Sequence, residues 1–376
     1  MEPTPHLDQE ACYRAVLTRD VRFDGRFFGC VKTTGIYCRP VCPARTPKRA
    51  NMVFVVSAAA AEEAGFRACL RCRPETAPDM GAWRGTSNTV SRALGLIEAG
   101  ALDAHSEAGG DVEALATRLG VGERQLRRLF RQHLGAAPVS VAQTRRVLLA
   151  KTLIHQTDLS MARVALASGF GSVRRFNETF QGLYGRPPSA LRRRTARVED
   201  GGIRLTLPYR PPLDLTGLMA SLAARGDVVQ TGVWTRELTS DIDGADGRVS
   251  VVAGPPGQLA VTVAVSDLRA LPGVLARVRR VFDLSADPEA IARDLSPDPA
   301  LTALIAARPG LRLAGDWCDP GEDAASDRVP EGLTAQHLGR LEPWRPWRAY
   351  GLAHLAAAGL HRDDLMTETD DDREAA

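Results

Sequence analysis

The residues best suited to do chemistry are four cysteines that occur as two close pairs. Three residues separate Cys38 from Cys42, two separate Cys69 from Cys72, and 26 residues lie between the pairs. Each pair can bind one side of a tetrahedral metal ion, so the four thiolates together can hold one Zn²⁺. Spacing alone leaves two interpretations open: an inert structural zinc site, or a zinc site in which one thiolate acts as a nucleophile.

Basic side chains crowd the sequence around these cysteines, which favours the second interpretation and a negatively charged partner. Residues 1–200 carry 30 Lys and Arg against 19 Asp and Glu, whereas residues 201–376 carry 18 against 26. A basic half predicts a polyanion as partner, and the forked donors of arginine suit phosphates and guanine edges. We therefore expect double-stranded DNA to bind near the cysteines. The basic residues that flank them are Arg39, Arg45, Lys48, Arg49, Arg67, Arg71 and Arg73.

Short strands and helices must hold the cysteine loops in place. The patterns predict helices over residues 8–17 and 58–64, the second capped by Ser57, and strands over residues 26–31 and 52–56. Few apolar residues lie in this stretch, so bound metal is expected to supply part of the folding energy. The three other cysteines are expected to pack inside the protein as small residues, and they are Cys12, Cys30 and Cys318.

Two similar helical units follow, and their pattern predicts a tandem helix-turn-helix domain. The first has a helix over residues 112–119 and a polar helix over 123–134, and the second repeats this over 161–168 and 172–180. A Gly-containing turn joins the helices of each unit, and a helix over residues 141–155 links the units. The alternative is two helix hairpins that only pack a core, but the second helices are polar and rich in arginine. The side chains expected to face base edges or phosphates are Arg124, Gln125, Arg128, Ser172, Arg174, Arg175 and Asn177.

The rest of the chain predicts an α+β domain followed by a less regular segment. Apolar patterns predict strands over residues 203–209, 228–234 and 247–265, with helices over 213–224 and 268–282. Loop and short helix are expected after residue 283, and a last helix is expected to end at residue 360. Before that helix, a tryptophan pair is expected to pack a core rather than to stack on bases, and it consists of Trp344 and Trp347.

These patterns together predict a multidomain α+β protein. It has a small zinc-bound α/β N-terminal domain over residues 1–78, an all-α tandem helix-turn-helix domain over 87–197 and an antiparallel α+β C-terminal domain over 200–283. A further segment spans residues 284–362, and the acidic tail over 363–376 is expected to be disordered. Four of the cysteines occur in close pairs, which is not typical of a secreted disulfide framework. The sequence also shows no apolar leader and no apolar stretch long enough to span a membrane. We therefore expect a cytoplasmic protein without a membrane partner.

Three segments of the chain resemble known families. Residues 10–75 resemble the N-terminal domain of the Ada family, the adaptive-response regulators of DNA alkylation repair. Residues 87–195 resemble the AraC-type DNA-binding domain, and residues 203–282 with the segment 344–350 resemble the AlkA-type 3-methyladenine glycosylases. This order is that of an Ada–AlkA fusion whose glycosylase part is truncated, and the resemblance implies that residues 284–362 are the truncated glycosylase remnant. The residues shared with the Ada family are Thr33, Thr34, Gly35, Ile36, Tyr37, Cys38, Arg39 and Pro40, then Cys42, Ala44, Arg45, residues 64–67, Cys69, Arg71 and Cys72.

The Ada resemblance implies a role for each cysteine. Cys38 would be the methyl acceptor, and Cys42, Cys69 and Cys72 would be its companion zinc ligands. The implied substrate is a methylphosphotriester in the DNA backbone, whose methyl group passes to Cys38 irreversibly in a single turnover. Methylation makes the cluster less negative, so the methylated protein is expected to bind promoter DNA more tightly and to regulate repair genes, with RNA polymerase as a partner. The implied DNA contacts near the acceptor are Thr34, Arg45, Arg67 and Arg71.

The motifs of two other repair activities are absent. The glycosylase family needs a helix-hairpin-helix followed by a catalytic Asp, and no such hairpin is found among residues 313–344. The Pro-Cys-His-Arg motif of O6-alkylguanine methyltransferases is also absent, since Cys318 lies in Trp-Cys-Asp. Two alternative functions remain: an AraC-type transcription factor with a purely structural zinc domain and, disfavoured, a 3-methyladenine glycosylase. The aspartates that lie in the glycosylase-like segment without the hairpin are Asp316, Asp319, Asp323 and Asp327.

Overall fold

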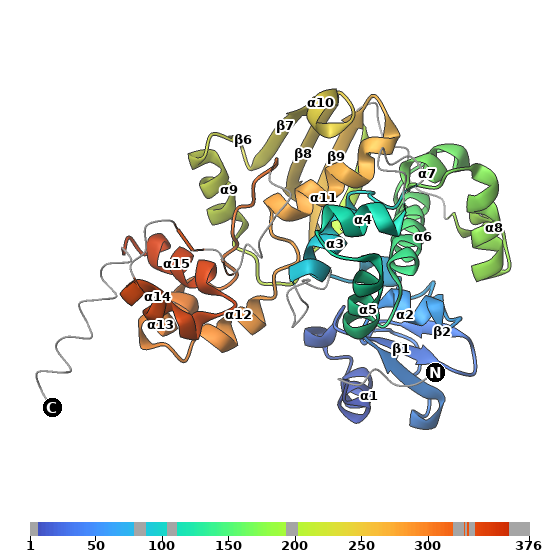
Figure 1. The fold of residues 1–376 in the computed structure, drawn as a ribbon, viewed down its shortest axis with the longest axis horizontal. Helices are drawn as coiled ribbons and strands as arrows, with labels where there is room; N and C mark the ends of the chain where they lie inside the picture. Colours follow the sequence, from blue (N-terminus) through green and yellow to red (C-terminus); the bar gives the residue numbers. More distant parts are fainter. Residues whose placement is uncertain are drawn as a thin grey trace, which may run out of the picture.

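The computed structural model describes residues 7–78, 88–103, 111–192, 202–318, 327, 329–330 and 335–360. Figure 1 shows four parts in chain order. We call them the cysteine domain (described residues 7–78, blue), the helical domain (88–192, cyan to green), the sheet domain (202–283, yellow to orange) and the C-terminal helices (284–360, orange to red). The protein is therefore a multidomain α+β protein, as predicted. The acidic tail from residue 363 lies outside the described residues.

The cysteine domain is a small four-stranded sheet with one helix before its first strand and a second helix between its last two strands. The sheet order is β3-β1-β2-β4, antiparallel except for the parallel pair β2–β4. The side chain of Asp8 accepts the first N–H groups of helix α1, and Ser57 caps α2 as predicted. The predicted strand over residues 26–31 is shorter than expected. The bounds are α1 Gln9–Thr18, β1 Phe28–Val31, β2 Ile36–Cys38, β3 Met52–Val55, α2 Ala58–Glu63 and β4 Arg67–Ala68.

The helical domain contains the two predicted helix-turn-helix units. Asp111 and Ser160 cap the first helices of the units. The linking helix begins at Pro138, three residues before the predicted start. Proline suits the first turn of a helix, because the backbone N–H that it lacks would have no partner within the helix at that position. The bounds are α3 Asn88–Glu98, α4 Val112–Arg118, α5 Glu123–Leu134, α6 Pro138–Gln156, α7 Met161–Ala167 and α8 Val173–Tyr184.

The sheet domain is a five-stranded antiparallel sheet in the order β5-β9-β8-β7-β6. The single strand predicted over residues 228–234 is wrong, because Thr231 and Gly232 both have positive φ and turn the chain into a hairpin. Trp234 on the sheet and Phe282 after α11 meet edge to face at 5.5 Å in the core. The bounds are β5 Ile203–Pro208, α9 Leu215–Ala224, β6 Val228–Gln230, β7 Val233–Leu238, α10 Ser240–Asp243, β8 Gly247–Ala253, β9 Gln258–Val265 and α11 Leu271–Val281.

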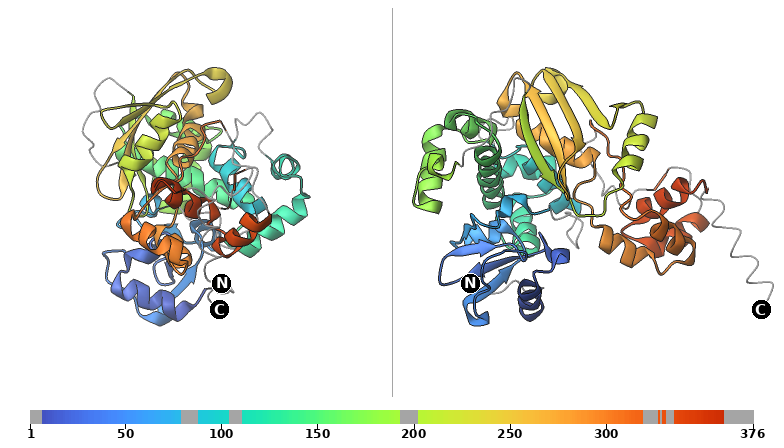
Figure 2. Two further views of the ribbon diagram at one scale, coloured as in Figure 1. Left: turned by 90° about the vertical axis from the view of Figure 1, so that its left-hand side faces the viewer. Right: turned by 180° about the vertical axis from the view of Figure 1, so that it is seen from behind.

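The C-terminal helices pack around a tryptophan pair. Trp344 and Trp347 are 2% and 1% exposed, and their ring N–H groups donate to Asp298 and Asp294 at 2.7 and 3.0 Å. The prediction that they pack a core is thus confirmed. Figures 1 and 2 show these helices beside the sheet domain. The bounds are α12 Pro288–Leu295, α13 Pro299–Ala307, α14 Ala335–Leu341 and α15 Arg348–Ala357.

The single cysteines divide into two groups. Cys12 and Cys30 are buried as predicted, and burial raises the pKa of each thiol to about 12. The prediction for Cys318 is wrong, because this residue is exposed. Its neighbour Trp317 occupies the core at 3% exposure, and Asp316 accepts the N–H of Cys318, which holds the chain in a turn with the thiol outside. Among the described residues, no helix has the length and apolar character that crossing a membrane needs.

Candidate metal centre and nucleic-acid interface

The four paired cysteines come together at one end of the small sheet. Their sulfur atoms all lie within 4.8 Å of one another. The parallel register pairs Tyr37 with Ala68, so the next residue of each strand, Cys38 and Cys69, reaches the same place. Cys42 follows Cys38 after a short turn, and Cys72 lies just before the 3-10 turn η3, Pro74–Thr76. The fold thus brings together residues that are far apart in the sequence.

This geometry fits one tetrahedral zinc ion. A Zn–S bond of about 2.3 Å places the sulfurs of a tetrahedral site about 3.8 Å apart. The four sulfur atoms are compatible with that spacing, and the all-cysteine donor set is one that zinc prefers. Mutual hydrogen bonding among the thiols lowers the pKa of Cys42 to about 7, above all through Cys38, and raises the pKa of Cys38, above all through Cys42. The protons that these hydrogen bonds hold are the ones that a bound Zn²⁺ would displace.

Cys38 differs from its three companions in exposure and in hydrogen bonding. Cys42, Cys69 and Cys72 are 9%, 7% and 8% exposed, whereas Cys38 is half-buried. The backbone N–H of Arg39 donates to Cys72 at 3.4 Å, that of Arg71 donates to Cys69 at 3.3 Å, and that of Ala44 bonds Cys42. Within residues 7–78 no such backbone donor is found for Cys38. Cys38 is therefore the most exposed residue of the four, and its sulfur interacts with the companion thiols rather than with a backbone donor of residues 7–78.

Part of the basic flank serves the fold rather than a ligand. The guanidinium of Arg39 binds Asp24 and donates to Thr76 Oγ1 at 2.6 Å, so it is turned into the cysteine domain. Arg49 pairs with Glu10, and Arg73 with Glu75. The sequence did not predict these structural roles, because the acidic partners of Arg39 and Arg49 lie at least 15 residues away.

The remaining basic residues lie nearer the surface, around the cluster. Arg45 and Arg71 are exposed, and Arg67 is half-buried on β4. Thr34 is exposed in the turn between β1 and β2. These four are the residues predicted to contact DNA beside Cys38, and the structure brings them to the domain that carries the cluster. Their contacts with DNA stay predictions.

The second helix of each helix-turn-helix unit has one buried and one exposed face. Leu126 and Phe130 of α5 are fully buried, as are Phe176 and Phe180 of α8. The Ser172 hydroxyl caps α8 by accepting the N–H of Arg175 at 3.2 Å, and Arg174 pairs with Glu178 at 2.8 Å on the helix surface. The apolar faces therefore form the core and leave the polar faces outside. All seven side chains predicted to contact DNA from these helices are exposed, and they are Arg124, Gln125, Arg128, Ser172, Arg174, Arg175 and Asn177.

Three family models match the chain, and their order follows the structural parts. The metal binding domain of Ada matches residues 11–75, a helix-turn-helix domain matches residues 115–194, and the AlkA N-terminal domain matches residues 204–318. A zinc-binding domain joined to a helix-turn-helix domain defines an Ada-like, DNA-binding regulator of DNA repair. Zinc is therefore the cofactor and DNA the partner.

Individual relatives identify the family. The chain is 39% identical over 350 residues to the "Probable bifunctional transcriptional activator/DNA repair enzyme AlkA" of Mycobacterium tuberculosis, with 89% of this chain and 69% of that protein covered. The chain belongs to this Ada–AlkA family. It is 36% identical over 138 residues to the "Bifunctional transcriptional activator/DNA repair enzyme Ada" of Escherichia coli, covering 37% of this chain and 36% of that one. A solved structure of E. coli Ada with DNA is 34% identical over 38% of this chain and 96% of its own, with a TM-score of 0.19, which carries no structural argument.

The sequence motifs did not indicate the residues that join the cysteine domain to the helical domain. They include Glu62, Glu75, Thr144 and Lys151, none of which belongs to a motif. One signal was present: the chain has three lysines, and only Lys151 lies in a helix with apolar neighbours on both sides. A lone lysine in such a helix in an arginine-rich protein indicates a buried, paired charge.

Proposed function

We propose that this protein transfers a methyl group irreversibly from a DNA methylphosphotriester to Cys38 and thereby becomes a stronger regulator of repair genes. The observation that carries the proposal is the difference between Cys38 and its three companions. Cys38 is the most exposed residue of the four, and no backbone N–H of residues 7–78 donates to its sulfur. A purely structural site gives no reason for that difference.

The cysteines suit this chemistry because a thiolate is a good nucleophile towards a methyl carbon. Bound zinc keeps its cysteine ligands deprotonated at neutral pH. The Cys38 Sγ lone pair forms the S–C bond, the O–C bond of the triester breaks, and its electron pair stays on oxygen as an ordinary phosphodiester. The phosphodiester is a good leaving group, so no general base is needed. The thioether on Cys38 does not revert, so each molecule reacts once.

The same step changes the charge that faces DNA. Four thiolates and one Zn²⁺ carry a formal charge of minus two, and methylation of one sulfur reduces it to minus one. Repulsion between the cluster and nearby phosphates then falls, while the surface arginines Arg45 and Arg71 keep their attraction. The methylated form is therefore expected to bind its operator more tightly, by the factor of about 5 to 150 that is usual for such coupling. As an activator, it would act through RNA polymerase.

Mass spectrometry tests the transfer. Full-length zinc-loaded protein is incubated with a duplex that carries methylphosphotriesters, and the cysteine peptides are then weighed. We expect one added methyl group, on the peptide of Cys38, and none in the Cys38→Ala variant. Cys30→Ala is the matched control, because Cys30 is buried in the same domain outside the cluster, and it should take up methyl like the wild type. A wild type that stays unmodified would leave a transcription factor with a structural zinc domain as the function.

A further inference from the structure

Glu62 links the neighbour of the acceptor cysteine to the helix that joins the two helix-turn-helix units. It lies in α2 and accepts a hydrogen bond from the Tyr37 hydroxyl at 3.0 Å through Oε1. Its other oxygen, Oε2, accepts one from the Thr144 hydroxyl at 2.7 Å. Tyr37 directly precedes Cys38 on β2, and Thr144 lies in α6. One carboxylate therefore spans from the strand of the metal centre to the helical domain.

Glu75 makes a second link on the other side of the cluster. It lies in η3, three residues after the ligand Cys72, and its Oε2 accepts from Lys151 Nζ at 2.7 Å. Both of these side chains are 0% exposed. Lys151 belongs to α6, and its Nζ also lies 5.8 Å from the ring centroid of Tyr184, the last residue of α8. This ion pair thus connects the ligand loop to α6 and to the end of the second unit's recognition helix.

Helix α2 reaches the first unit as well. The Ser57 hydroxyl donates to the carbonyl of Leu134, the last residue of α5, at 2.7 Å. Glu63 pairs with Arg131 of α5 at 2.5 Å and accepts the N–H of Ala137 at 3.1 Å. The cysteine domain therefore contacts the C-terminal end of α5 directly and is linked to that of α8 through Lys151. In Figure 1, α8 lies on the side of α6 away from the C-terminal helices and the cysteine domain lies below α6, and the reversed view in Figure 2 agrees.

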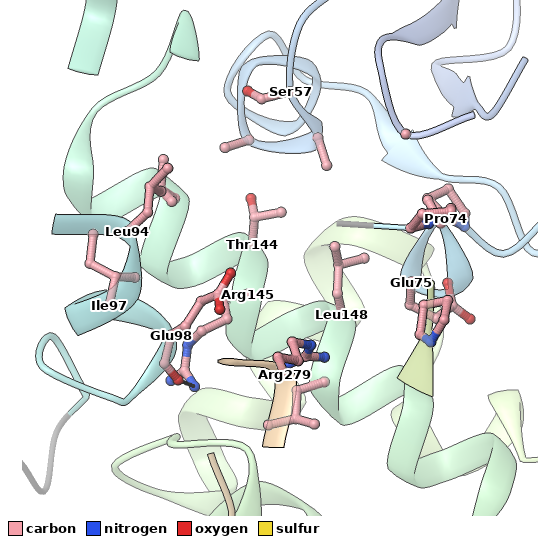
Figure 3. A pocket seen from close by; sticks show the side chains of 18 of the residues that line it. Ser57, Pro74, Glu75, Leu94, Ile97, Glu98, Thr144, Arg145, Leu148 and Arg279 are labelled. Carbon is pink, nitrogen blue, oxygen red and sulfur yellow. Dashed lines mark hydrogen bonds between the residues drawn. The ribbon is translucent and has the colours of Figure 1, made fainter. Parts of the chain in front are cut away.

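Apolar contact covers only part of the junction. Ala59 and Ala60 of α2 share a core cluster with Ala136, Val141 and Leu148 of the helical domain. Beside this cluster, a cavity of about 690 Å³ lies between the cysteine domain, the helical domain and the sheet domain. Figure 3 shows Ser57 at the top of the view, Glu75 at the right, and Thr144, Leu148 and Arg279 near the centre. The polar links at the edge of the cavity therefore add directional contacts to the apolar cluster in fixing one domain against the other.

We propose that Glu62 and Glu75 are positioning residues that hold the Cys38 face and the two recognition helices at one fixed spacing, so that they bind DNA as a rigid unit. The proposal rests on the proposed function, since it takes the Cys38 face to contact DNA. Two DNA-binding modules that are fixed relative to each other need no ordering when they bind together. If the junction is loose, the two modules bind a DNA site that contains both of their contact regions more weakly. They then tolerate a wrong spacing between these regions better.

The spacing of the DNA site provides the test. A duplex is selected from random sequence for tight binding to full-length protein, and the footprints of the two domains are mapped on it. Insertion of about five base pairs between the footprints turns one of them by half a helical turn. Thr144→Val removes the hydroxyl group that donates a hydrogen bond to Glu62. Thr152→Val is the matched control, because Thr152 lies in the same helix and its hydroxyl donates to Leu148 of that helix.

We expect the wild type and Thr152→Val to lose affinity on insertion. Thr144→Val should bind the original duplex about 5- to 100-fold more weakly and lose much less on insertion. The double variant Glu75→Gln/Lys151→Met, which replaces the ion pair by uncharged groups of similar size, should behave in the same way. Circular dichroism verifies that each variant is folded. Equal sensitivity to insertion in all proteins, or a wild type indifferent to it, would overturn the proposal.

Methyl uptake by Cys38, measured on the same proteins, separates this proposal from the proposed function. Thr144→Val keeps every group of the cluster, so its methyl uptake should equal that of the wild type. If the wild type takes up no methyl, the proposed function fails, while the insertion experiment still decides whether the junction fixes the spacing. If Thr144→Val loses methyl uptake together with affinity, the residue supports the fold of the cluster and the positioning proposal is wrong.

Discussion

The buried ion pair between Lys151 and Glu75 gives the sharpest stability prediction. Both side chains are 0% exposed, and their charged atoms lie 2.7 Å apart. Breaking a buried pair by removing one partner leaves an uncompensated charge and costs about 3–5 kcal/mol. Arg73 Nε remains 3.2 Å from Glu75 in Lys151→Met, so the lower end of that range applies. The pKa of Glu75 is lowered even though burial raises it, because Lys151 together with the backbone and Arg73 outweighs burial, so Lys151→Met removes most of what stabilises the buried carboxylate.

Urea unfolding followed by far-ultraviolet circular dichroism measures this cost. We expect Lys151→Met to lose about 3 kcal/mol of unfolding free energy, whereas Glu75→Gln/Lys151→Met should recover to within about 1 kcal/mol of the wild type, since an uncharged pair has no desolvation cost. Lys48→Met is the matched control, because Lys48 is exposed on the cysteine domain and should change stability little. Equal stability of Lys151→Met and Lys48→Met would refute the assignment of Lys151 as a charge compensated by Glu75.

Two further predictions concern DNA binding and pH. Arg71→Ala should weaken DNA binding. It should also reduce the slope of the logarithm of the DNA association constant against the logarithm of salt concentration by about one, as the loss of one phosphate contact does. Arg269→Ala, at an exposed position in the sheet domain, is the control and should leave that slope unchanged. Burial raises the pKa of Asp283 to about 6, against an ordinary value of 3.8, beside the Tyr350 hydroxyl. Between these two pH values the folded chain holds a proton that the unfolded chain has released, so rising pH destabilises the fold by up to about 3 kcal/mol. Asp283→Asn should remove that slope from unfolding curves measured between pH 4 and pH 6, and an unchanged slope would contradict the shift.

Local patterns predicted well wherever a residue's neighbours in sequence are also its neighbours in space. The helix-turn-helix units follow from apolar spacing within each helix, and Phe130 and Phe176 occupy the core positions that this spacing requires. The cysteine pairs are similarly local, and each brings two ligands within one short turn. The hairpin at Thr231 was missed because a non-glycine residue with positive φ leaves a weak signal, so one long strand and two short ones have almost the same pattern.

Contacts between distant segments were beyond the reach of those patterns. Arg39 has the same sequence signal as Arg45, yet Asp24 and Thr76 turn the first into the domain and leave the second at the surface. The difference depends on where a carboxylate 15 residues earlier comes to lie, and neither spacing nor composition contains that information. An arginine-rich flank can therefore predict a DNA-binding face, while only the fold separates the guanidinium groups that can reach a phosphate from those that hold the metal loops.

The same reasoning explains why the domain junction matters for function. Glu62 and Glu75 look like ordinary surface acids in the sequence, and each becomes informative only through a partner on α6, 82 and 76 residues away. A carboxylate between two domains costs free energy unless both domains supply donors, so such contacts persist where the relative position of the domains has a use. In the proposed function one domain carries the reactive cysteine and the other carries two recognition helices. A fixed distance between them would allow one chemical event at Cys38 to be registered at a defined DNA sequence.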